Sequence, residues 1–172
     1  MSLKISTETT FLLDMIHSTY GPELHISANA ASDPYGNEAN ATTGWTQTGL
    51  TGTGSNVFES QSSVKNTGSY ALHANCNDTP TASAQCKLEL TVTAGATYRL
   101  TFDWRHVGSG GNWACTAESS LVGQLANTAT SFAPVAHEET AVGTTFTIIF
   151  IELSGTNNGG VYIDNLSLKK VL

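Results

Sequence analysis

The chain has 172 residues, of which only 12% are charged, and its formal net charge at pH 7 is −7. This length predicts a single domain that is large enough to bury its own core. Phosphate binding depends on clustered Lys and Arg, so this charge balance argues against a protein that binds nucleic acids or an anionic membrane surface. Membrane insertion is not expected either, because no apolar run approaches the ~20 residues that span a bilayer.

The first 21 residues predict an N-terminal arm, distinct from a domain that covers residues 22–172. Four apolar residues of the arm fall at helical spacing: Phe11, Leu12, Met15 and Ile16. They predict a short helix that ends before Gly21–Pro22, and a surface that docks on a partner chain or a symmetry mate. The apolar run is interrupted by Asp14 and has no small-residue cleavage site, so a secretory signal peptide is not expected.

From Pro22 onward, short alternating runs separated by Gly, Asn and Thr clusters indicate an all-β domain. Five runs predict strands: 69–74, 85–92, 97–106, 144–153 and 161–168. In the clearest of them, 97–106, apolar side chains occupy every second position and polar ones lie between. The run 144–153 is apolar on both faces in its middle, which predicts a central strand covered on both sides. Residues 28–44 and 46–56 are long and polar and predict loops.

Turn residues separate these runs. Segments that tolerate positive φ occur at 66–69 (NTGS), 93–97 (TAGAT), 108–112 (GSGGN) and 155–160 (GTNNGG). The glycine-rich segment 108–112 is not followed by a Lys-Ser/Thr helix start, so it predicts a flexible hairpin turn rather than a phosphate-binding loop.

Cys76 and Cys86 bracket a polar loop, and Cys115 stands apart. The two bracketing cysteines form a disulfide if their strand ends are adjacent. The favoured alternative is three reduced, semi-apolar residues.

Four motifs occur in a distinctive order: GW (44–45), GSYAL (68–72), TAGATYRLTFDW (93–104) and GGVYIDNLSL (159–168). Together they resemble the carbohydrate-binding modules of the family 4/9 and 22 type, which belong to the galactose-binding-like group. The resemblance implies a jelly-roll β-sandwich of two antiparallel sheets over residues 22–172. The short, two-faced strands favour the same fold with about eight strands and with Trp45 in its core.

Residues suited to catalysis are few. The candidate groups on or near polar strand faces are His73, Asp103, Arg105 and His106, while Glu138–Glu139 is expected in a loop. The spacing suggests no pair of carboxylates for glycoside hydrolysis, and the sequence has no G-x-S-x-G or H-E-x-x-H motif. The sequence therefore predicts a protein that is not an enzyme.

Sugar binding requires aromatic faces that stack on pyranose rings and planar polar groups that bond hydroxyls. Trp113 follows the glycine-rich turn and is the aromatic residue expected to be most exposed, with Tyr35 next. His73, Asp103 and Arg105, joined by Asn75, are expected to line the polar sheet face between them. The alternative for each residue is an ordinary solvated side chain.

Asp164 lies within the apolar closing strand. In the resembled modules a structural Ca²⁺ ties the leading strand to the closing strand, which implies Asp164 as a calcium ligand. The other expected acids are absent, since the leading segment has no Phe-Glu pair and Thr67 precedes GSYAL. The alternative is that Asp164 caps a turn by accepting hydrogen bonds from backbone N–H groups of the leading segment.

These expectations combine into a non-catalytic binding or structural protein. The favoured hypothesis is a virion component of a bacteriophage, made in the host cytoplasm as a capsid decoration or tail protein. Its arm would dock on a partner, in a homo-oligomer or larger assembly, and its loops would hold host surface glycans. The alternative is an extracellular carbohydrate-binding module of a bacterial polysaccharide-degrading system, and a third reading is a glycan-active enzyme.

Overall fold

The computed structural model describes residues 20–23, 42–50, 56–76, 84–153 and 159–172, which form eleven strands. Sheet A contains β1 (Tyr20–Glu23), β3 (Val57–Gln61), β4 (Ala71–Cys76), β6 (Thr97–Gly108), β9 (Ala133–Thr140) and β11 (Gly159–Val171). Sheet B contains β2 (Trp45–Thr48), β5 (Gln85–Thr91), β7 (Trp113–Ala117), β8 (Ser120–Leu125) and β10 (Thr145–Glu152). In this part of the chain, no helix has the length and apolar character needed to cross a membrane.

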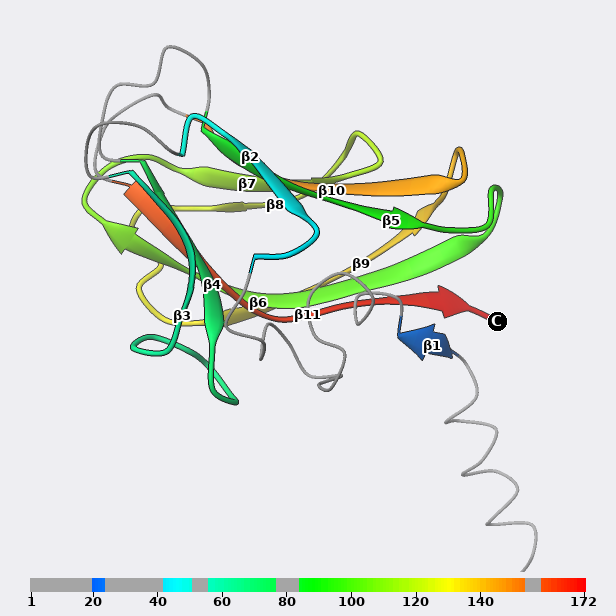
Figure 1. The fold of residues 1–172 in the computed structure, drawn as a ribbon, viewed down its shortest axis with the longest axis horizontal. Helices are drawn as coiled ribbons and strands as arrows, with labels where there is room; N and C mark the ends of the chain where they lie inside the picture. Colours follow the sequence, from blue (N-terminus) through cyan, green and yellow to red (C-terminus); the bar gives the residue numbers. More distant parts are fainter. Residues whose placement is uncertain (1–19, 24–41, 51–55, 77–83, 154–158) are drawn as a thin grey trace, which may run out of the picture.

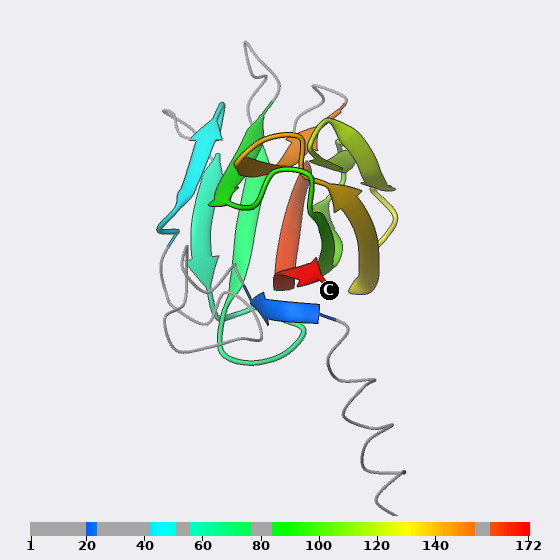
Figure 2. The ribbon, with the colours of Figure 1, turned by 90° about the vertical axis from the view of Figure 1, so that its right-hand side faces the viewer.

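Both sheets are antiparallel, and they pack face to face as the two layers of a β-sandwich (Figures 1 and 2). Sheet A has the order β3-β4-β11-β6-β9, with β1 paired to the far end of β11, and sheet B has the order β2-β5-β10-β7-β8. The expected all-β sandwich of two antiparallel sheets is therefore confirmed.

The core lies between the sheets because each strand turns alternate side chains inward. Aromatic rings join the layers: Phe102 of β6 contacts Phe150 of β10 at 5.1 Å between centroids, and Tyr98 contacts Phe146 at 5.8 Å. Trp45 is only 8% exposed and packs near Phe150, as expected from its Gly-Trp motif.

Each of the five predicted strands exists, with small shifts in its bounds. β10 is central in sheet B, but its outer side chains Ile149 and Ile151 are only half-buried, so it is not fully covered on both faces. Several other strands were not predicted. β2 overlaps the start of the predicted loop 46–56, and β9 contains Glu138–Glu139, which were expected in a loop.

The segment 108–112 connects β6 of sheet A to β7 of sheet B. It is therefore a crossover between the layers and not the predicted hairpin turn. Glycine is required here for space as well as for φ. A Cβ on Gly159 would lie 2.2 Å from the Gly110 carbonyl oxygen, and Gly111, at φ 58°, packs against the Glu152 carboxylate.

Strand β1 begins at Tyr20 and spans the expected boundary between residues 21 and 22. The docking residues predicted in the arm, Phe11, Leu12, Met15 and Ile16, lie outside the described residues. Cys76, Cys86 and Cys115 are buried free thiols, which agrees with the reduced alternative. Burial raises the pKa of both Cys86 and Cys115, which keeps these thiols protonated.

Candidate functional site

A row of side chains crosses the outer face of sheet A. Residues paired across adjacent strands form it: Glu59 of β3 faces His73 of β4, His73 faces Tyr162 of β11, and Tyr162 faces Arg105 of β6. Phe132, directly before β9, ends the row, since its ring lies under the Arg105 guanidinium. The row exists because the alternation that turns Leu72, Ile163 and Trp104 into the core turns their neighbours outward.

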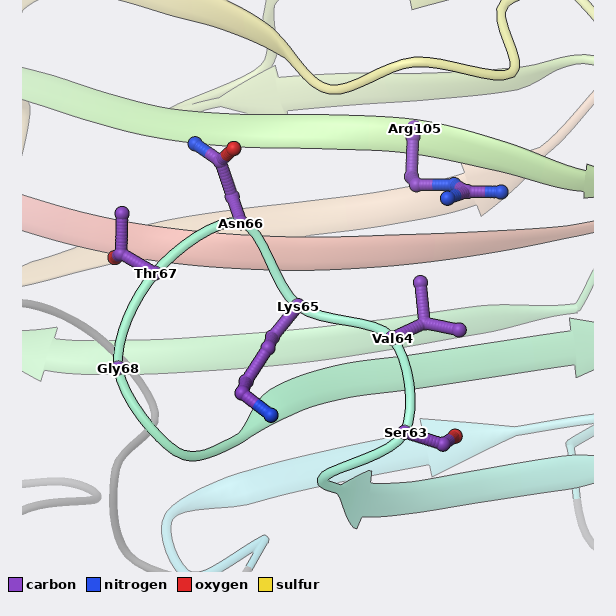
Figure 3. Close-up of a pocket in the computed structure, with 7 residues that line it drawn as sticks. All are labelled: Ser63, Val64, Lys65, Asn66, Thr67, Gly68 and Arg105. Carbon is purple, nitrogen blue, oxygen red and sulfur yellow. The ribbon is translucent and has the colours of Figure 1, made fainter.

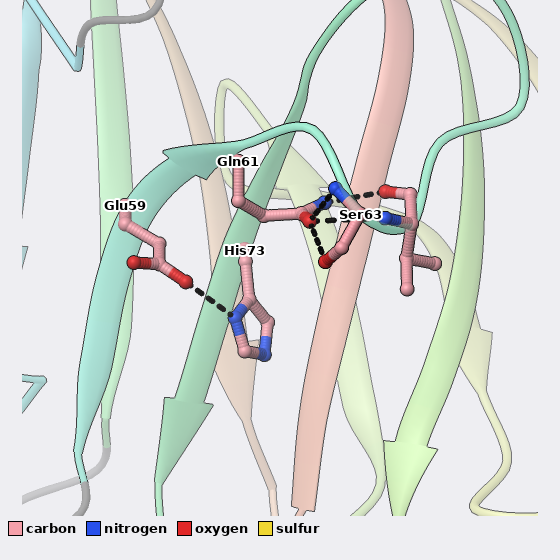
Figure 4. A network of polar contacts seen from close by, with 5 residues as sticks. Glu59, Gln61, Ser63 and His73 are labelled. Atoms are coloured by element: carbon pink, nitrogen blue, oxygen red, sulfur yellow. Dashed lines mark hydrogen bonds and ion pairs between the residues drawn. The ribbon is translucent and has the colours of Figure 1, made fainter.

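The middle of this row is closely packed. The rings of His73 and Tyr162 stack with a centroid distance of 4.3 Å and an interplanar angle of 17°. Glu59, whose side chain is 54% exposed, lies 3.4 Å from Nδ1 of His73 (Figure 4). Burial lowers the pKa of His73, and the hydrogen bond to Glu59 offsets part of that change. Burial also raises the pKa of Tyr162, so both rings are neutral near pH 7 and pack as apolar surfaces.

Arg105 lies between two aromatic rings. Its guanidinium carbon is 5.7 Å from the centroid of Tyr162 and 5.8 Å from that of Phe132. Such contacts help to orient the planar guanidinium. Phe132 is half-buried, so the edge of this stack reaches the solvent.

The β3–β4 loop, residues 62–70, passes over this face of sheet A. At its start, the Gln61 side chain holds the loop: Oε1 accepts from the backbone N–H of Ser63 at 2.7 Å and of Val64 at 3.0 Å, and Nε2 donates to the Val64 carbonyl (Figure 4). Its far end is held by Asp164, whose Oδ2 accepts from the backbone N–H groups of Asn66 at 2.6 Å and Thr67 at 3.0 Å.

Asp103 reinforces this second attachment. Its Oδ2 accepts from Nδ2 of Asn66 at 2.9 Å and from Nδ2 of Asn165 at 2.6 Å. Asn165 in turn accepts a hydrogen bond from Oγ1 of Thr67 at 2.6 Å. Asp103, Asp164 and Asn165 thus form an anchor that holds the loop above the sheet, and we call these three residues the loop anchor.

An open pocket of about 460 Å³ lies between the loop and the sheet. Its lining residues come from the loop and from β6: Ser63, Val64, Lys65, Asn66, Thr67, Gly68 and Arg105. Figure 3 shows Arg105 extending from β6 above the loop, while the Lys65 side chain points away from Arg105. Polar groups and one guanidinium therefore surround a space wide enough for part of a sugar chain.

Only some of the predicted site residues lie together on the outer face of sheet A. His73, Asp103 and Arg105 share the outer face of sheet A, as expected. Trp113, predicted to be exposed, has no exposed surface, because it is the first inward-facing residue of β7 and lies opposite Glu152. The prediction of an exposed Trp113 is wrong. Tyr35 lies outside the described residues.

His106 was expected on or near a polar face and lies in the core instead. It continues the inward positions of β6, is fully buried, and its Nε2 is 2.7 Å from the Gly111 carbonyl oxygen. Asn75, by contrast, lies on the outer face of β4, two residues from His73.

The calcium ion that the resemblance implies at Asp164 stays a prediction, because the described contacts of this residue are those of a turn cap. Asp164 is fully buried, and its carboxylate accepts from N–H donors: Asn66 and Thr67 on Oδ2, and the backbone N–H of Asn165 on Oδ1 at 2.7 Å. Calcium requires six or more oxygen ligands. No group of three or more metal-binding His, Cys, Asp or Glu side chains occurs among the described residues. Among the described residues, Asp164 caps a turn of the β3–β4 loop by accepting backbone N–H groups, which is the kind of role that the alternative gave it.

Sequence reasoning missed several parts of this site. Phe132 and Tyr162 were not considered as site residues, and the loop 62–70 was seen only as a turn at its end. Tyr162 was detectable, because it lies between Val161 and Ile163, two residues that the strand pattern turns inward. Phe132 carried no such signal, because it precedes a strand whose pattern is weak.

No protein-family model and no curated protein matches the sequence. Solved structures are similar in fold. The tandem CBM22-1–CBM22-2 domain of Paenibacillus barcinonensis Xyn10C matches 90% of this chain and 47% of its own, at 14% identity and a TM-score of 0.64. The CBM22-1 xylan-binding domain of that protein matches 80% of this chain and 92% of its own, at 12% identity and a TM-score of 0.59.

A third similar structure is the enzymatically active domain of tailspike protein 4 from bacteriophage CBA120. It matches 74% of this chain but only 19% of its own, at 16% identity and a TM-score of 0.54. At these identities, the similarities establish the fold. The chain shares the two-layer β-sandwich fold of these carbohydrate-binding modules.

Proposed function

We propose that this protein is a non-catalytic carbohydrate-binding protein that holds a glycan on the outer face of sheet A. The observation that supports this proposal is the pocket between the β3–β4 loop and Arg105, together with the ring of Phe132, which contacts the Arg105 guanidinium. Sugar recognition combines an aromatic surface with planar polar groups, and this pocket offers both next to each other. The fold shared with a xylan-binding domain supports the same class of ligand.

The carboxylates nearest the pocket support binding rather than catalysis. Asp164 is buried and accepts three backbone N–H groups, and Asp103 accepts two side-chain amides. The two acids face each other across β11 and β6, a pairing that the sequence spacing did not suggest. Both carboxylates hold the loop, which argues against a role for either as a general acid or base toward a bound sugar.

A glycan array that carries neutral and acidic plant, algal and bacterial polysaccharides tests the proposal. We expect the wild-type protein to retain at least one glycan class. Phe132→Ala should weaken that binding by about fivefold or more, as expected for an aromatic anchor. Leu121→Ala is the matched control, because Leu121 is a 56% exposed apolar residue of β8 in sheet B. The absence of any retained glycan would overturn the proposal. An equal loss of glycan affinity in both variants would show that Phe132 does not mark the binding site.

For the biological setting of this binding function, we propose a component of a bacteriophage virion. The fold similarity to a bacteriophage tailspike domain supports it. A phage component of this kind would be made in the host cytoplasm and would attach to its particle through the arm, where Phe11, Leu12, Met15 and Ile16 supply apolar contacts. Deleting residues 1–19 leaves the described strands intact, and we expect it to abolish incorporation, as measured by mass spectrometry of purified particles. Incorporation of the truncated chain would refute docking by the arm.

An extracellular module of a bacterial polysaccharide-degrading system is equally compatible with the fold, as the xylan-binding domain illustrates. The glycan array separates the two settings. Tight binding to one plant or algal polysaccharide favours the degrading system, and binding confined to bacterial surface glycans favours the virion.

A further inference from the structure

The chain has only two arginines, and their environments differ. Arg99 is paired: its Nη1 donates to Glu138 Oε1 at 3.2 Å and to the Tyr20 hydroxyl at 3.1 Å. Arg105 forms no ion pair with any described residue, and its Nε is buried without a hydrogen-bond partner. In a protein of net charge −7, an arginine such as Arg105 that pairs with no described carboxylate is unexpected.

A buried donor without an acceptor is costly, and such donors usually have a partner in the functional state. The aromatic rings on either side of Arg105 satisfy its charge only in part and offer no acceptor in the plane of the guanidinium. Contacts with both rings restrict the guanidinium and so limit the orientations of its N–H groups. The guanidinium is therefore preorganised for an acceptor that comes from outside the described residues.

The pocket next to Arg105 has the charge that such an acceptor requires. No Asp or Glu lines it, and its second cationic residue is Lys65. Lys65 is exposed and donates to the Ser62 carbonyl at 2.8 Å, a surface contact that a rotation of this long side chain can exchange for another. Asp103, the nearest acid on β6, accepts from Asn66 and Asn165 through Oδ2, on the loop-anchor side.

We propose that this pocket binds the carboxylate of an acidic sugar, such as a uronic acid residue of a polysaccharide, with Arg105 as the principal contact. This inference rests on the proposed glycan-binding function and narrows its ligand class. A carboxylate matches the planar fork of the guanidinium and carries one charge, as Arg105 does. Lys65 reaches the same group from the rim, and Phe132 and the polar loop side chains contact the ring.

Nuclear magnetic resonance gives a direct test, because two arginines produce only two Nε–H signals. Arg99 is the internal control. We expect millimolar glucuronate or galacturonate to shift the Arg105 signal, glucose or galactose at equal concentration to shift it little, and Arg99 to stay unchanged. If acetate or sulfate shifts the Arg105 signal as much as the uronates do, the pocket is a general anion site and the proposal of an acidic sugar is overturned.

The second test measures the affinity of the protein for a uronate-containing polysaccharide and for the carboxyl-reduced form of the same polysaccharide. The polysaccharide is chosen from the glycan class that the protein retains on the array. We expect the native form to bind at least about tenfold more tightly, which corresponds to one charge-assisted contact. Arg105→Met should remove this preference, whereas Arg99→Met should preserve it. Equal binding of both forms would overturn this inference and leave the glycan-binding function standing. Binding of no glycan of either charge would overturn both.

Discussion

The hydrogen bonds of the loop anchor predict a large loss of stability when Asp164 is replaced by Asn. Its carboxylate accepts three backbone N–H groups while fully buried, so Asp164→Asn replaces one acceptor oxygen by an NH₂ group. If the amide oxygen stays on Asn66 and Thr67, those two hydrogen bonds change from charged to neutral, at about 1 kcal/mol each. The NH₂ group then faces the N–H of Asn165, and an unsatisfied buried donor costs about 1–3 kcal/mol.

We therefore expect Asp164→Asn to lower the free energy of unfolding by about 3–5 kcal/mol and Tm by roughly 10 °C. Urea denaturation with an unchanged m-value measures this. Asp103→Asn is the matched control: an amide oxygen can still accept from both Asn66 and Asn165, so its loss should stay below about 1 kcal/mol.

Two results would refute this reasoning. The first is an Asp164→Asn protein within about 1 kcal/mol of wild type, which would mean that the three N–H groups find other acceptors. The second is a Tm of the wild-type protein that rises with millimolar calcium and falls with EDTA, while that of the Asp164→Asn protein responds to neither. That result would restore Asp164 as a metal ligand.

Three further predictions concern the fold. Gly159→Ala should cost more than about 3 kcal/mol, since its Cβ would meet the Gly110 carbonyl, whereas Gly143→Ala, with nothing within 4 Å, should stay within about 0.5 kcal/mol in the same urea assay. Folding lowers the pKa of His73 from its ordinary value of 6.5, so the unfolded chain binds more protons than the folded chain as the pH falls through 6.5. The urea midpoint of the wild-type protein should therefore fall over this pH range. The midpoint of His73→Gln should fall by a smaller amount. All three tryptophans are at most 8% exposed, so acrylamide should quench their fluorescence weakly until the protein unfolds; strong quenching of the native protein would contradict the burial of Trp113.

The sequence predicted the fold where alternation was strong and failed where it was weak. β6 has aromatic or branched residues at each inward position, and so its face was correctly assigned. β7 turns Trp113, Cys115 and Ala117 inward, and two of these residues are too small to reveal a period of two. Trp113 was consequently not recognised as an inward-facing strand residue and was expected to be exposed after the glycine-rich turn. His106 was misplaced for a different reason: it continues the inward positions of Phe102 and Trp104, but its polar ring does not extend the apolar pattern of that face.

The site was less predictable, because it depends on pairing between strands distant in sequence. His73 and Arg105 were chosen for chemistry alone, and only the register places Tyr162 between them. The β3–β4 loop posed the same difficulty. Asn66 and Thr67 are 98 and 97 residues before the carboxylate that holds them, and no local pattern records that contact.

The irregularity in β11 is what allows one strand to serve both the core and the pocket. Val161 and Ile163 face the core, and so do Leu166 and Leu168, which are out of phase with them by one residue. In a regular strand, burying Leu166 and Leu168 would turn Tyr162 inward and remove it from Arg105. The register shift between Asp164 and Ser167, with Asn165 at φ 52°, absorbs the extra residue. Because Asp164 and Asn165 hold the β3–β4 loop at that same point, the bulge sets the face of Tyr162 and the position of the pocket wall together.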